Sequence, residues 1–563
     1  MLAIGTRASA LAMVQATILR DALTSIEAES RIVTITTDGD VRAPDTAWGE
    51  GAFVTAIEMA LVEGRIDVAI HSAKDVPTEE DPRLTIAAYL QREDPRDALV
   101  VARSAAGDRP AMDLVTLPVG SRVGTDSPRR TAFLLARRPD LQVHPIHGNV
   151  DTRLRRLDEG ETDALVLASA GLNRLGLEDR ISSHLDASWI PPAPGQGALA
   201  VQVRTDDATA LDLLSRLDHA PTRRAVELER AILTQAGGGC RAPLGVLVVA
   251  DGEGLAVTAG YARPGGGLAT MTTRRVSEGA VDGLAASIVD ELAARATLLA
   301  QAGGAPRVLV TRAADRWAPT ALALVDHGLA PLLVPCIEVE SAPNDELDAA
   351  VGGLDRPDPV EWVVLTSVSA VQAIVATAGR LGVTLAPHPL GPRWAAIGRA
   401  TAAAMRGAGI EVDLQPAHAA GPALAASLPI QAGTRVLLPR GDLADEFLPS
   451  ALAERGAVVT EVLAYRTTEA PVASIPLLEA ALAEAPAAIV ATSGSTLRGL
   501  LALGAAIGAE DRLRGIALVT IGSSTAAEAD RLGFAGAREA ASPDPAGIAD
   551  AVAELLLEAS AVR

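Results

Sequence analysis

A lysine and an aspartate stand side by side at positions 74 and 75, after an apolar run over residues 66–70 that predicts a strand. Lys74 is the only lysine among 563 residues, since the other 48 of the 49 basic side chains are arginine. An ammonium is a compact point charge, which arginine cannot replace where one anionic group must fit closely beside Asp75. Strand ends are where α/β proteins place much of their chemistry. We expect the pair to act on an anionic ligand, with a solvated Lys–Asp turn as the alternative.

Basic side chains also gather at three predicted strand-to-helix junctions. Two arginines at a helix N-terminus, which is already positive, cost stability unless an anion binds there. Guanidinium forks hold carboxylates bidentately, so several such clusters suit a polycarboxylate. An ordinary capped helix is the alternative, above all at the first junction. The junctions are Arg7 with Ser9, Ser127 with Arg129 and Arg130, and His147 with Arg153.

A thiol follows three glycines in the stretch Gly237, Gly238, Gly239, Cys240. One glycine would be enough to end the helix predicted over residues 221–235. The surplus removes side chains around the sulfur and permits positive φ, which suits a cysteine that carries a bulky adduct. A buried inert cysteine or a flexible glycine loop are the alternatives.

The composition excludes several classes of function. A net charge of -21 argues against a nucleic-acid or anionic-membrane surface, and 2% aromatic residues leave little for base stacking. The two cysteines are far apart in sequence, so we expect no disulfide framework and a cytoplasmic location. No apolar run of membrane-spanning length and no metal-binding motif is present in the sequence, so we expect neither membrane nor metal.

Predicted strands and helices alternate from the start, which indicates an α/β protein. Two α/β lobes, with the chain crossing between them near residues 92–97 and back through 199–203, resemble a hinged, periplasmic-binding-protein-like fold. A polar stretch over 38–51 is expected to be a mobile loop or lid. A small α+β domain and a short linker over 300–306 follow. The predicted strands are 2–5, 31–37, 66–70, 98–102, 119–124, 199–203, 244–250, 255–262 and 270–276, and the helices are 9–27, 221–235 and 281–299.

The second half of the chain repeats itself. The segments 308–312, 365–367 and 397–399 recur as 436–440, 491–493 and 521–523, at offsets of 128, 126 and 124 residues. A nearly constant offset implies an internal duplication and two similar α/β domains with parallel, Rossmann-like sheets. Helix N-termini in this half could bind carboxylates through N–H groups and hydroxyls, although each alone is an ordinary N-cap. The hydroxyls are those of Thr366, Ser367, Ser493, Ser524 and Thr525.

Residues 1 to about 300 closely resemble the porphobilinogen deaminase (hydroxymethylbilane synthase) family, most specifically in 71–77, 92–98, 124–130, 195–198 and 238–245. The resemblance implies a transferase that joins four porphobilinogen units, with loss of ammonia, onto a dipyrromethane cofactor held through a thioether to Cys240. It implies that Asp75, with Lys74, handles protons and stabilises cationic intermediates. It also implies that the cofactor is bound by Lys74, Asp75, Ser127, Arg129, Arg130 and Gln196. Substrate would bind Arg7, Ser9, Phe53, Ser72, His147, Arg153 and Arg174.

Two departures from the family pattern bear on turnover. His147 stands where the family usually has an arginine, and histidine as a residue type is monodentate and titrates near neutral pH. Thr46 and Glu50 stand where the active-site loop commonly carries lysines. We therefore expect slower or more pH-dependent catalysis than is typical.

Residues 306–563 resemble the uroporphyrinogen-III synthase family, through the repeat and the segment 461–467. The resemblance implies two domains joined by extended connectors, with one domain discontinuous. The hydro-lyase reaction would close hydroxymethylbilane to uroporphyrinogen III with inversion of its last ring. Tyr465 is the side chain we assign to the departing hydroxyl. Cys336 is expected to pack in the core.

The sequence therefore predicts a multifunctional enzyme of porphyrin and heme biosynthesis that acts on porphobilinogen and hydroxymethylbilane. Two rivals remain: a non-catalytic bilobal polycarboxylate-binding protein with an α/β sensor domain, and an active deaminase with a degenerate second half. We expect three domains in the first half: 1–92 together with 198–218, then 97–193, then 220–300. A linker over 301–306 follows. The second half is expected to form two domains, one of 307–336 together with 466–563 and one of 338–464.

Overall fold

The computed structural model describes residues 1–36, 54–78, 81–102, 112–238, 242–252, 254–264, 266–277, 281–354, 360–386, 391–417, 420–444 and 446–561. The expected lid over 38–51 lies outside these residues.

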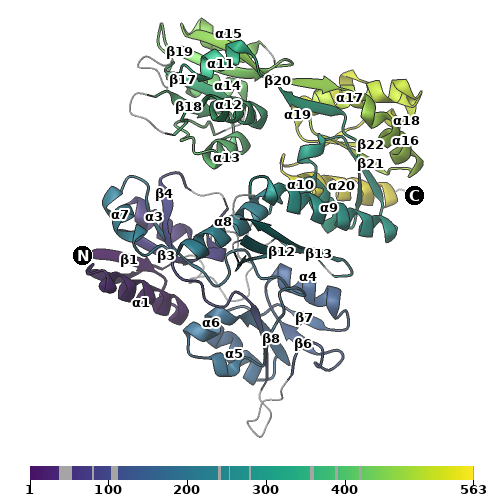
Figure 1. Cartoon of the computed structure of the whole chain (residues 1–563). Helices are drawn as coiled ribbons and strands as arrows, with labels where there is room; N and C mark the ends of the chain where they lie inside the picture. The colour runs from purple at the N-terminus through teal and green to yellow at the C-terminus, as the bar shows by residue number, and fades with distance from the viewer. Residues whose placement is uncertain are drawn as a thin grey trace. The chain divides into compact units, whose positions relative to one another are not determined.

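The first lobe is built on a mixed sheet of strand order β2-β1-β3-β10-β4. Strands β1, β3 and β4 of this sheet are labelled in Figure 1. Strand β10 is antiparallel to both β3 and β4, which confirms that the chain crosses back to the first lobe after residue 198. Ile4, Leu19, Val68 and Val201 form part of a buried core between this sheet and α1. The elements are β1 (Leu2–Thr6), α1 (Ala10–Ser25), β2 (Ser30–Thr34), α3 (Thr55–Val62), β3 (Val68–Ser72), β4 (Leu84–Tyr89), β10 (Leu199–Arg204) and α7 (Ala208–Ser215).

The second lobe repeats this plan with the sheet order β7-β6-β8-β5-β9. The predicted strand over 119–124 is too long, because Gly120 has φ +77° and Ser121 N–H closes a turn onto the Pro118 carbonyl. Its elements are β5 (Asp97–Val101), β6 (Arg122–Gly124), α4 (Pro128–Arg137), β7 (Gln142–His144), α5 (Val150–Asp158), β8 (Ala164–Ala168), α6 (Ser169–Arg174) and β9 (Ser183–His184).

A three-stranded antiparallel sheet and two helices form the predicted small α+β domain. They are α8 (Ala220–Gln235), β11 (Leu244–Asp251), β12 (Gly254–Ala262), β13 (Ala269–Ser277) and α9 (Leu284–Ala302). Helix α9 continues through Ala302, so the first residues of the expected linker are helical.

The second half contains two five-stranded sheets whose orders are β15-β14-β21-β22-β23 and β16-β20-β19-β17-β18. The strands that carry the sequence repeat occupy matching places, since β14-β21-β22 in one sheet corresponds to β19-β17-β18 in the other. The predicted duplication is confirmed. Of these three repeat strands, however, each sheet contains one from one copy of the repeat and two from the other copy. The strands are β14 (Arg307–Val310), β15 (Ala330–Leu333), β16 (Ile337–Ser341), β17 (Trp362–Leu365), β18 (Arg393–Ala396), β19 (Arg435–Gly441), β20 (Val458–Glu469), β21 (Ala488–Ala491), β22 (Ala517–Thr520) and β23 (Arg538–Glu539).

Strands β16 and β20 are the two connectors between these domains, and they pair antiparallel from Ile337↔Glu469 to Ser341↔Tyr465. Cys336, directly before β16, lies in a buried hydrophobic cluster with Leu497 and Phe534, as expected. The helices are α10 (Ala318–Asp326), α11 (Asp345–Val351), α12 (Val368–Leu381), α13 (Arg399–Gly407), α14 (Gly421–Ser427), α15 (Phe447–Glu454), α16 (Ile475–Ala483), α17 (Gly494–Ala506), α18 (Glu510–Arg514), α19 (Ser523–Arg531) and α20 (Pro545–Ala561).

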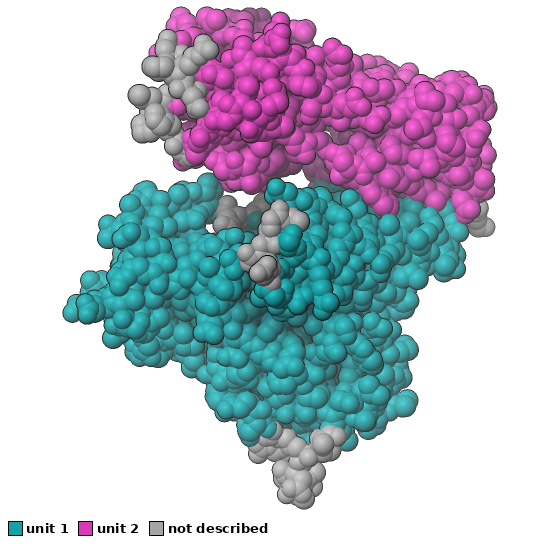
Figure 2. Space-filling model, in the orientation of Figure 1, with its two compact units in different colours: residues 1–307, 318–331, 544–557 teal, residues 308–317, 332–543, 558–563 magenta. Residues whose placement is uncertain are grey.

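The chain forms two compact units (Figure 2). The first contains residues 1–307 and also 318–331 and 544–557, which include α10 and most of α20. Within this unit α10 packs against α9, and the Tyr261 hydroxyl donates a hydrogen bond to the Leu322 carbonyl at 3.3 Å. The predicted domain boundaries stay a prediction.

Candidate active sites

Lys74 and Asp75 lie in a single 3₁₀ turn, Ala73–Asp75, at the end of the buried strand β3. Both line a cavity of about 270 Å³ between the two lobes of the first unit. Asp75 is exposed to solvent at this cavity, and other protein groups lie close around its carboxyl. Desolvation by the surrounding protein raises the pKa of its carboxyl, and the positive charges of Lys74 and Arg7 only partly oppose that shift.

The Lys74 ammonium donates a hydrogen bond to Oε1 of Gln196 at 3.2 Å. Burial lowers the pKa of Lys74 to about 8, although the neighbouring Asp75 carboxylate favours its charged form. Gln196 lies between Gly195 and Gly197, whose φ angles are +76° and +90°. A Cβ on Gly195 would lie 3.1 Å from the backbone nitrogen of Lys74. Glycine at this position therefore lets the returning chain pack directly on the turn.

Most of the predicted ligand-binding side chains of the first half line the same cavity. Ser9 caps α1 by accepting the Ala12 N–H at 3.4 Å, and Ser72 Oγ accepts a hydrogen bond from Gln15 at 3.1 Å. Arg174 donates to the Gly197 carbonyl at 2.7 Å, and burial lowers the pKa of its guanidinium to about 10. The predicted residues that line the cavity are Arg7, Ser9, Ser72, Lys74, Asp75, Arg153, Arg174 and Gln196.

Arg129 and Arg130 instead lie beside it, on a fully buried carboxylate that the sequence analysis missed. Asp97 accepts hydrogen bonds from Arg129 at 2.8 Å, from Arg130 at 2.7 Å and from Gln196 at 2.9 Å. Burial alone would raise the pKa of Asp97, but the two guanidiniums hold it well below its usual range. Ser127 caps α4 as predicted, accepting the Arg130 N–H at 3.4 Å.

His147 contacts a carboxylate and is not among the residues that line the cavity. Its Nδ1 lies 2.8 Å from Oδ2 of Asp126, and Arg153 Nη2 lies 3.4 Å from the same oxygen. The other Asp126 oxygen is buried and has no hydrogen-bond partner. His147 can therefore influence a ligand through Asp126 and Arg153.

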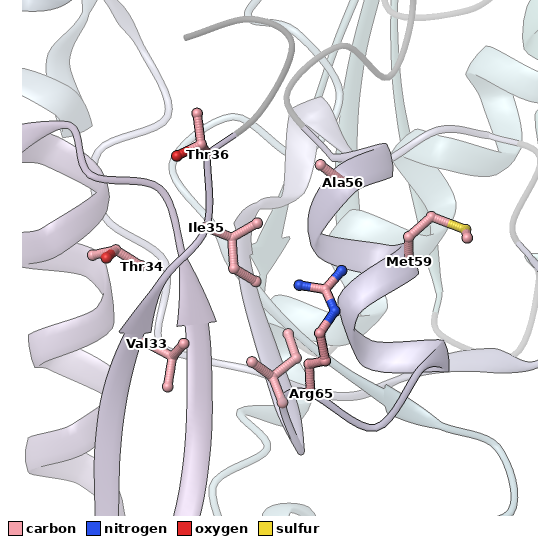
Figure 3. Close-up of a pocket in the computed structure, with 8 residues that line it drawn as sticks. Val33, Thr34, Ile35, Thr36, Ala56, Met59 and Arg65 are labelled. Carbon is pink, nitrogen blue, oxygen red and sulfur yellow. The ribbon is translucent and has the colours of Figure 1, made fainter. Parts of the chain in front are cut away.

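A separate pocket of about 490 Å³ lies between β2 and α3 (Figure 3). Thr34, Met59 and Arg65 line it, and its described lining contains none of the predicted site residues. Arg65 Nε lies 2.7 Å from the Glu63 carboxylate, so its charge is already balanced.

In the second half, predicted hydroxyls follow the carboxyl ends of parallel strands. Ser367 caps α12 and accepts the Ala370 N–H at 3.1 Å, while Ser493 forms a capping box with Thr496 at the start of α17. Thr366 immediately follows β17, and Thr525 is buried near the start of α19 while Ser524 is exposed. In open α/β sheets such strand ends are where ligands bind.

Arg316 links the strand-end regions of these two domains. It lies in the segment between β14 and α10, and its Nη2 donates to Ser369 Oγ of α12 at 2.7 Å. Burial lowers the pKa of nearby Arg312, and the positive charge of Arg316 lowers it further. Sequence reasoning assigned neither arginine to the site, although Arg312 lies in the repeated segment.

Tyr465 lies on the connector β20, half-buried, where β20 forms a bulge opposite Gly441 of β19. A Cβ on Gly441 would lie 2.5 Å from Cε2 of the Tyr465 ring, so the ring packs directly on the glycine. Phe53, Cys240, Thr46 and Glu50 lie outside the described residues.

Among the described residues there is no group of three histidine, cysteine or acidic side chains that could hold a metal ion. No described helix is long and apolar enough to cross a membrane.

Comparisons with known proteins match both halves. The family model "Porphobilinogen deaminase, dipyromethane cofactor binding domain" matches residues 2–212, and "Uroporphyrinogen-III synthase HemD" matches 318–550. The porphobilinogen deaminase of Roseiflexus sp. (strain RS-1) is 45% identical over 296 residues, which are 52% of this chain and 95% of that protein. That of Mycobacterium ulcerans (strain Agy99) is 48% identical over 248 residues, 44% of this chain and 77% of that protein.

A solved mutant uroporphyrinogen III synthase from Thermus thermophilus is 21% identical and has a TM-score of 0.35, covering 45% of this chain and 100% of that one. Through its first half the chain belongs to the porphobilinogen deaminase family, and its second half matches the uroporphyrinogen-III synthase model, so the chain is a bifunctional fusion of a porphobilinogen deaminase domain and a uroporphyrinogen-III synthase domain.

Proposed function

We propose that four porphobilinogen units are joined at the Lys74–Asp75 cavity, and that residues at the strand ends of the second half close the resulting hydroxymethylbilane to uroporphyrinogen III. The observation that carries the proposal is that the Asp75 carboxylate lines the same cavity as Arg7, Arg153 and Arg174. A substrate with several carboxylates that becomes cationic as it reacts needs this combination.

Asp75 acts at two points in each addition. Loss of ammonia from porphobilinogen leaves a cation on the pyrrole, and the Asp75 carboxylate stabilises that charge at close range. Once the new carbon–carbon bond has formed, a ring proton must leave, and Asp75 accepts it. A carboxyl whose pKa is raised by partial desolvation is a stronger base than an ordinary aspartate, which favours this transfer.

The matched first domain is a dipyrromethane cofactor binding domain, and we propose that Cys240 holds this cofactor through a thioether. When bound, the cofactor supplies the ring onto which the first porphobilinogen is added. The donors present fit its carboxylates: Asp97 offsets only one of two guanidinium charges, and the buried Nε of Arg129 has no hydrogen-bond partner. We assign Lys74, Ser127, Arg129, Arg130 and Gln196 to holding it.

The substrate's acetate and propionate groups bind the remaining cations and hydroxyls of the cavity. Arg153 and Arg174 come from the second lobe and Arg7 with Ser9 from the first, so a bound chain is held from both sides. We assign substrate binding to Arg7, Ser9, Phe53, Ser72, Arg153 and Arg174, with His147 acting through Asp126.

In the second half, Tyr465 assists the departing hydroxyl and the strand-end groups hold the carboxylates of hydroxymethylbilane. Thr366, Ser367, Ser493, Ser524 and Thr525 would supply hydroxyls and N–H groups. Arg312 and Arg316 add positive charge near Ser369, and this charge would attract the carboxylates of hydroxymethylbilane. Both ligands are small molecules, and we propose that the protein works in the cytoplasm without metal, nucleic acid or membrane.

Product-isomer analysis tests the function. The purified chain is incubated with porphobilinogen, and the products are oxidised and separated as type I and type III uroporphyrins. Type III product would support both activities. Type I alone would mean that the second half is degenerate, and no product would favour the non-catalytic binding protein.

A further inference from the structure

Helix α8 holds the Lys74–Asp75 turn from two sides. It belongs to the small α+β domain, where it packs on β11 and α9, and its sequence runs on into the glycines before Cys240. Two consecutive residues of α8, Glu229 and Arg230, make the polar contacts, beside the apolar packing of Val226 with Ala73 and Val76.

Arg230 contacts the backbone directly after Asp75. Its Nη1 donates to the Val76 carbonyl at 2.9 Å and its Nη2 to the Pro77 carbonyl at 2.8 Å. A planar guanidinium that bonds two successive carbonyls fixes both the position and the orientation of that peptide segment.

Glu229 reaches the other side of the turn through the returning chain. Its side chain is fully buried and accepts the Gly195 N–H at 2.7 Å, the Val248 N–H at 2.8 Å and both Nη atoms of Arg92 at 2.7 and 2.9 Å. Gly195 packs against the Lys74 backbone, and Gln196 bonds the Lys74 ammonium. One carboxylate therefore ties the small domain to both segments that cross between the lobes.

We infer that Arg230 and Glu229 are positioning residues that couple the placement of the cysteine-bearing small domain to the placement of Asp75 in the cavity. The inference rests on the role proposed for Asp75. Any shift of the small domain while the pyrrole product lengthens would move α8 and, through Arg230, the peptide that orients Asp75.

Arg223 provides a matched control. It lies two helical turns before Arg230 on α8 and donates to the Ile86 and Ala87 carbonyls of β4 at 3.3 and 3.0 Å. Arg223→Met therefore removes the same kind of clamp between α8 and the first lobe, but away from the catalytic turn.

The test compares Arg230→Met, Arg230→Lys and Arg223→Met in the full chain. For Arg230→Met we expect kcat for porphobilinogen consumption to fall by about ten- to a hundredfold with little change in KM, because a small misplacement of a catalytic group has effects of this size. Amide hydrogen exchange should rise over residues 72–78, and the acid limb of the kcat profile should move to lower pH as Asp75 becomes more hydrated. Arg230→Lys, which can still bond one carbonyl, should recover part of the rate.

Equal losses in Arg230→Met and Arg223→Met, with unchanged exchange over residues 72–78, would overturn the inference and leave α8 as a merely structural clamp. If Arg230→Met does not fold, Arg230→Lys carries the same comparison. An inactive wild-type chain would instead count against the proposed function itself.

Discussion

The Lys74 ammonium lies 3.2 Å from Oε1 of Gln196, a residue 122 positions later in the chain. This contact joins the turn after β3 to the segment that returns from the second lobe, so the charge of Lys74 sits at the junction of both lobes. Its surroundings determine over what pH range that charge persists.

Binding of porphobilinogen should weaken at alkaline pH. Burial lowers the pKa of Lys74 to about 8. The side chain therefore carries its positive charge below that pH and loses the charge as the pH rises through the pKa. KM should then rise by about tenfold per pH unit above the pKa, since the charged fraction falls tenfold per unit. Steady-state kinetics between about pH 6.5 and 9.5 measure this. In Lys74→Arg the rise should disappear although activity is lower, and an identical alkaline rise in that variant would contradict the assignment.

Removal of the Asp97 carboxylate should destabilise the first unit strongly. Asp97→Asn leaves two buried guanidiniums without their counter-ion, which typically costs about 3–5 kcal/mol. Because the pKa of Asp97 is depressed in the folded state, its stabilising effect is complete above the ordinary aspartate pKa and is lost only at lower pH.

Urea unfolding at neutral pH checks this prediction. Asp94→Asn is the matched control, because its partner Arg96 is 45% exposed and pairs at the protein surface contribute about 0–1 kcal/mol. Similar losses of unfolding free energy in both variants would show that the buried triad of Asp97, Arg129 and Arg130 stabilises the fold no more than the surface pair does.

Replacement of His147 by arginine should flatten an acid-side optimum in the elongation rate. The histidine ring contacts Asp126, which also lies near Arg153, so the charge carried at position 147 affects the charge available to a substrate carboxylate. An imidazole, as a residue type, can change its charge with pH, whereas a guanidinium cannot. An arginine keeps a constant charge at that place. Rates measured from about pH 5.5 to 8 in both proteins decide the matter, and superimposable profiles would remove His147 from substrate binding.

Loss of the Tyr465 hydroxyl should change the isomer that is formed. If that hydroxyl assists departure of the substrate hydroxyl, Tyr465→Phe should slow enzymatic closure by about 10²-fold or more. Uncatalysed closure without inversion would then compete, and type I product should rise. Thr467→Val, on the same connector strand β20, serves as control. A normal type III yield and rate from Tyr465→Phe would exclude this role for the tyrosine.

Much of the architecture could be predicted from local signals. Ser9 and Ser127 cap the helices that their types and positions predicted, and the repeat offsets predicted two similar sheets. The exchange of strands between the repeat copies could not be read from offsets, because an offset relates positions in sequence and does not say which sheet a strand joins.

The candidate site was predictable where a residue type was unusual for its context, as with the single lysine at Lys74. Asp97, Glu229 and Arg230 were missed because their roles arise from long-range contacts. In the sequence Glu229 looks like an ordinary helical glutamate. Only in the folded chain do Arg92 and Gly195 approach its carboxylate and bind it in a buried place. The strand predicted over 119–124 begins only at Arg122, because the positive φ of Gly120 places a turn before it.

Attachment of the cofactor to Cys240 is the central claim, and intact-mass spectrometry tests it most directly. The wild-type chain and Cys240→Ser are purified from a host that synthesises porphobilinogen. A mass increment of two pyrrole units on the wild type that is absent from the variant is the predicted result. An unmodified wild-type chain, or the same increment on both proteins, would contradict it.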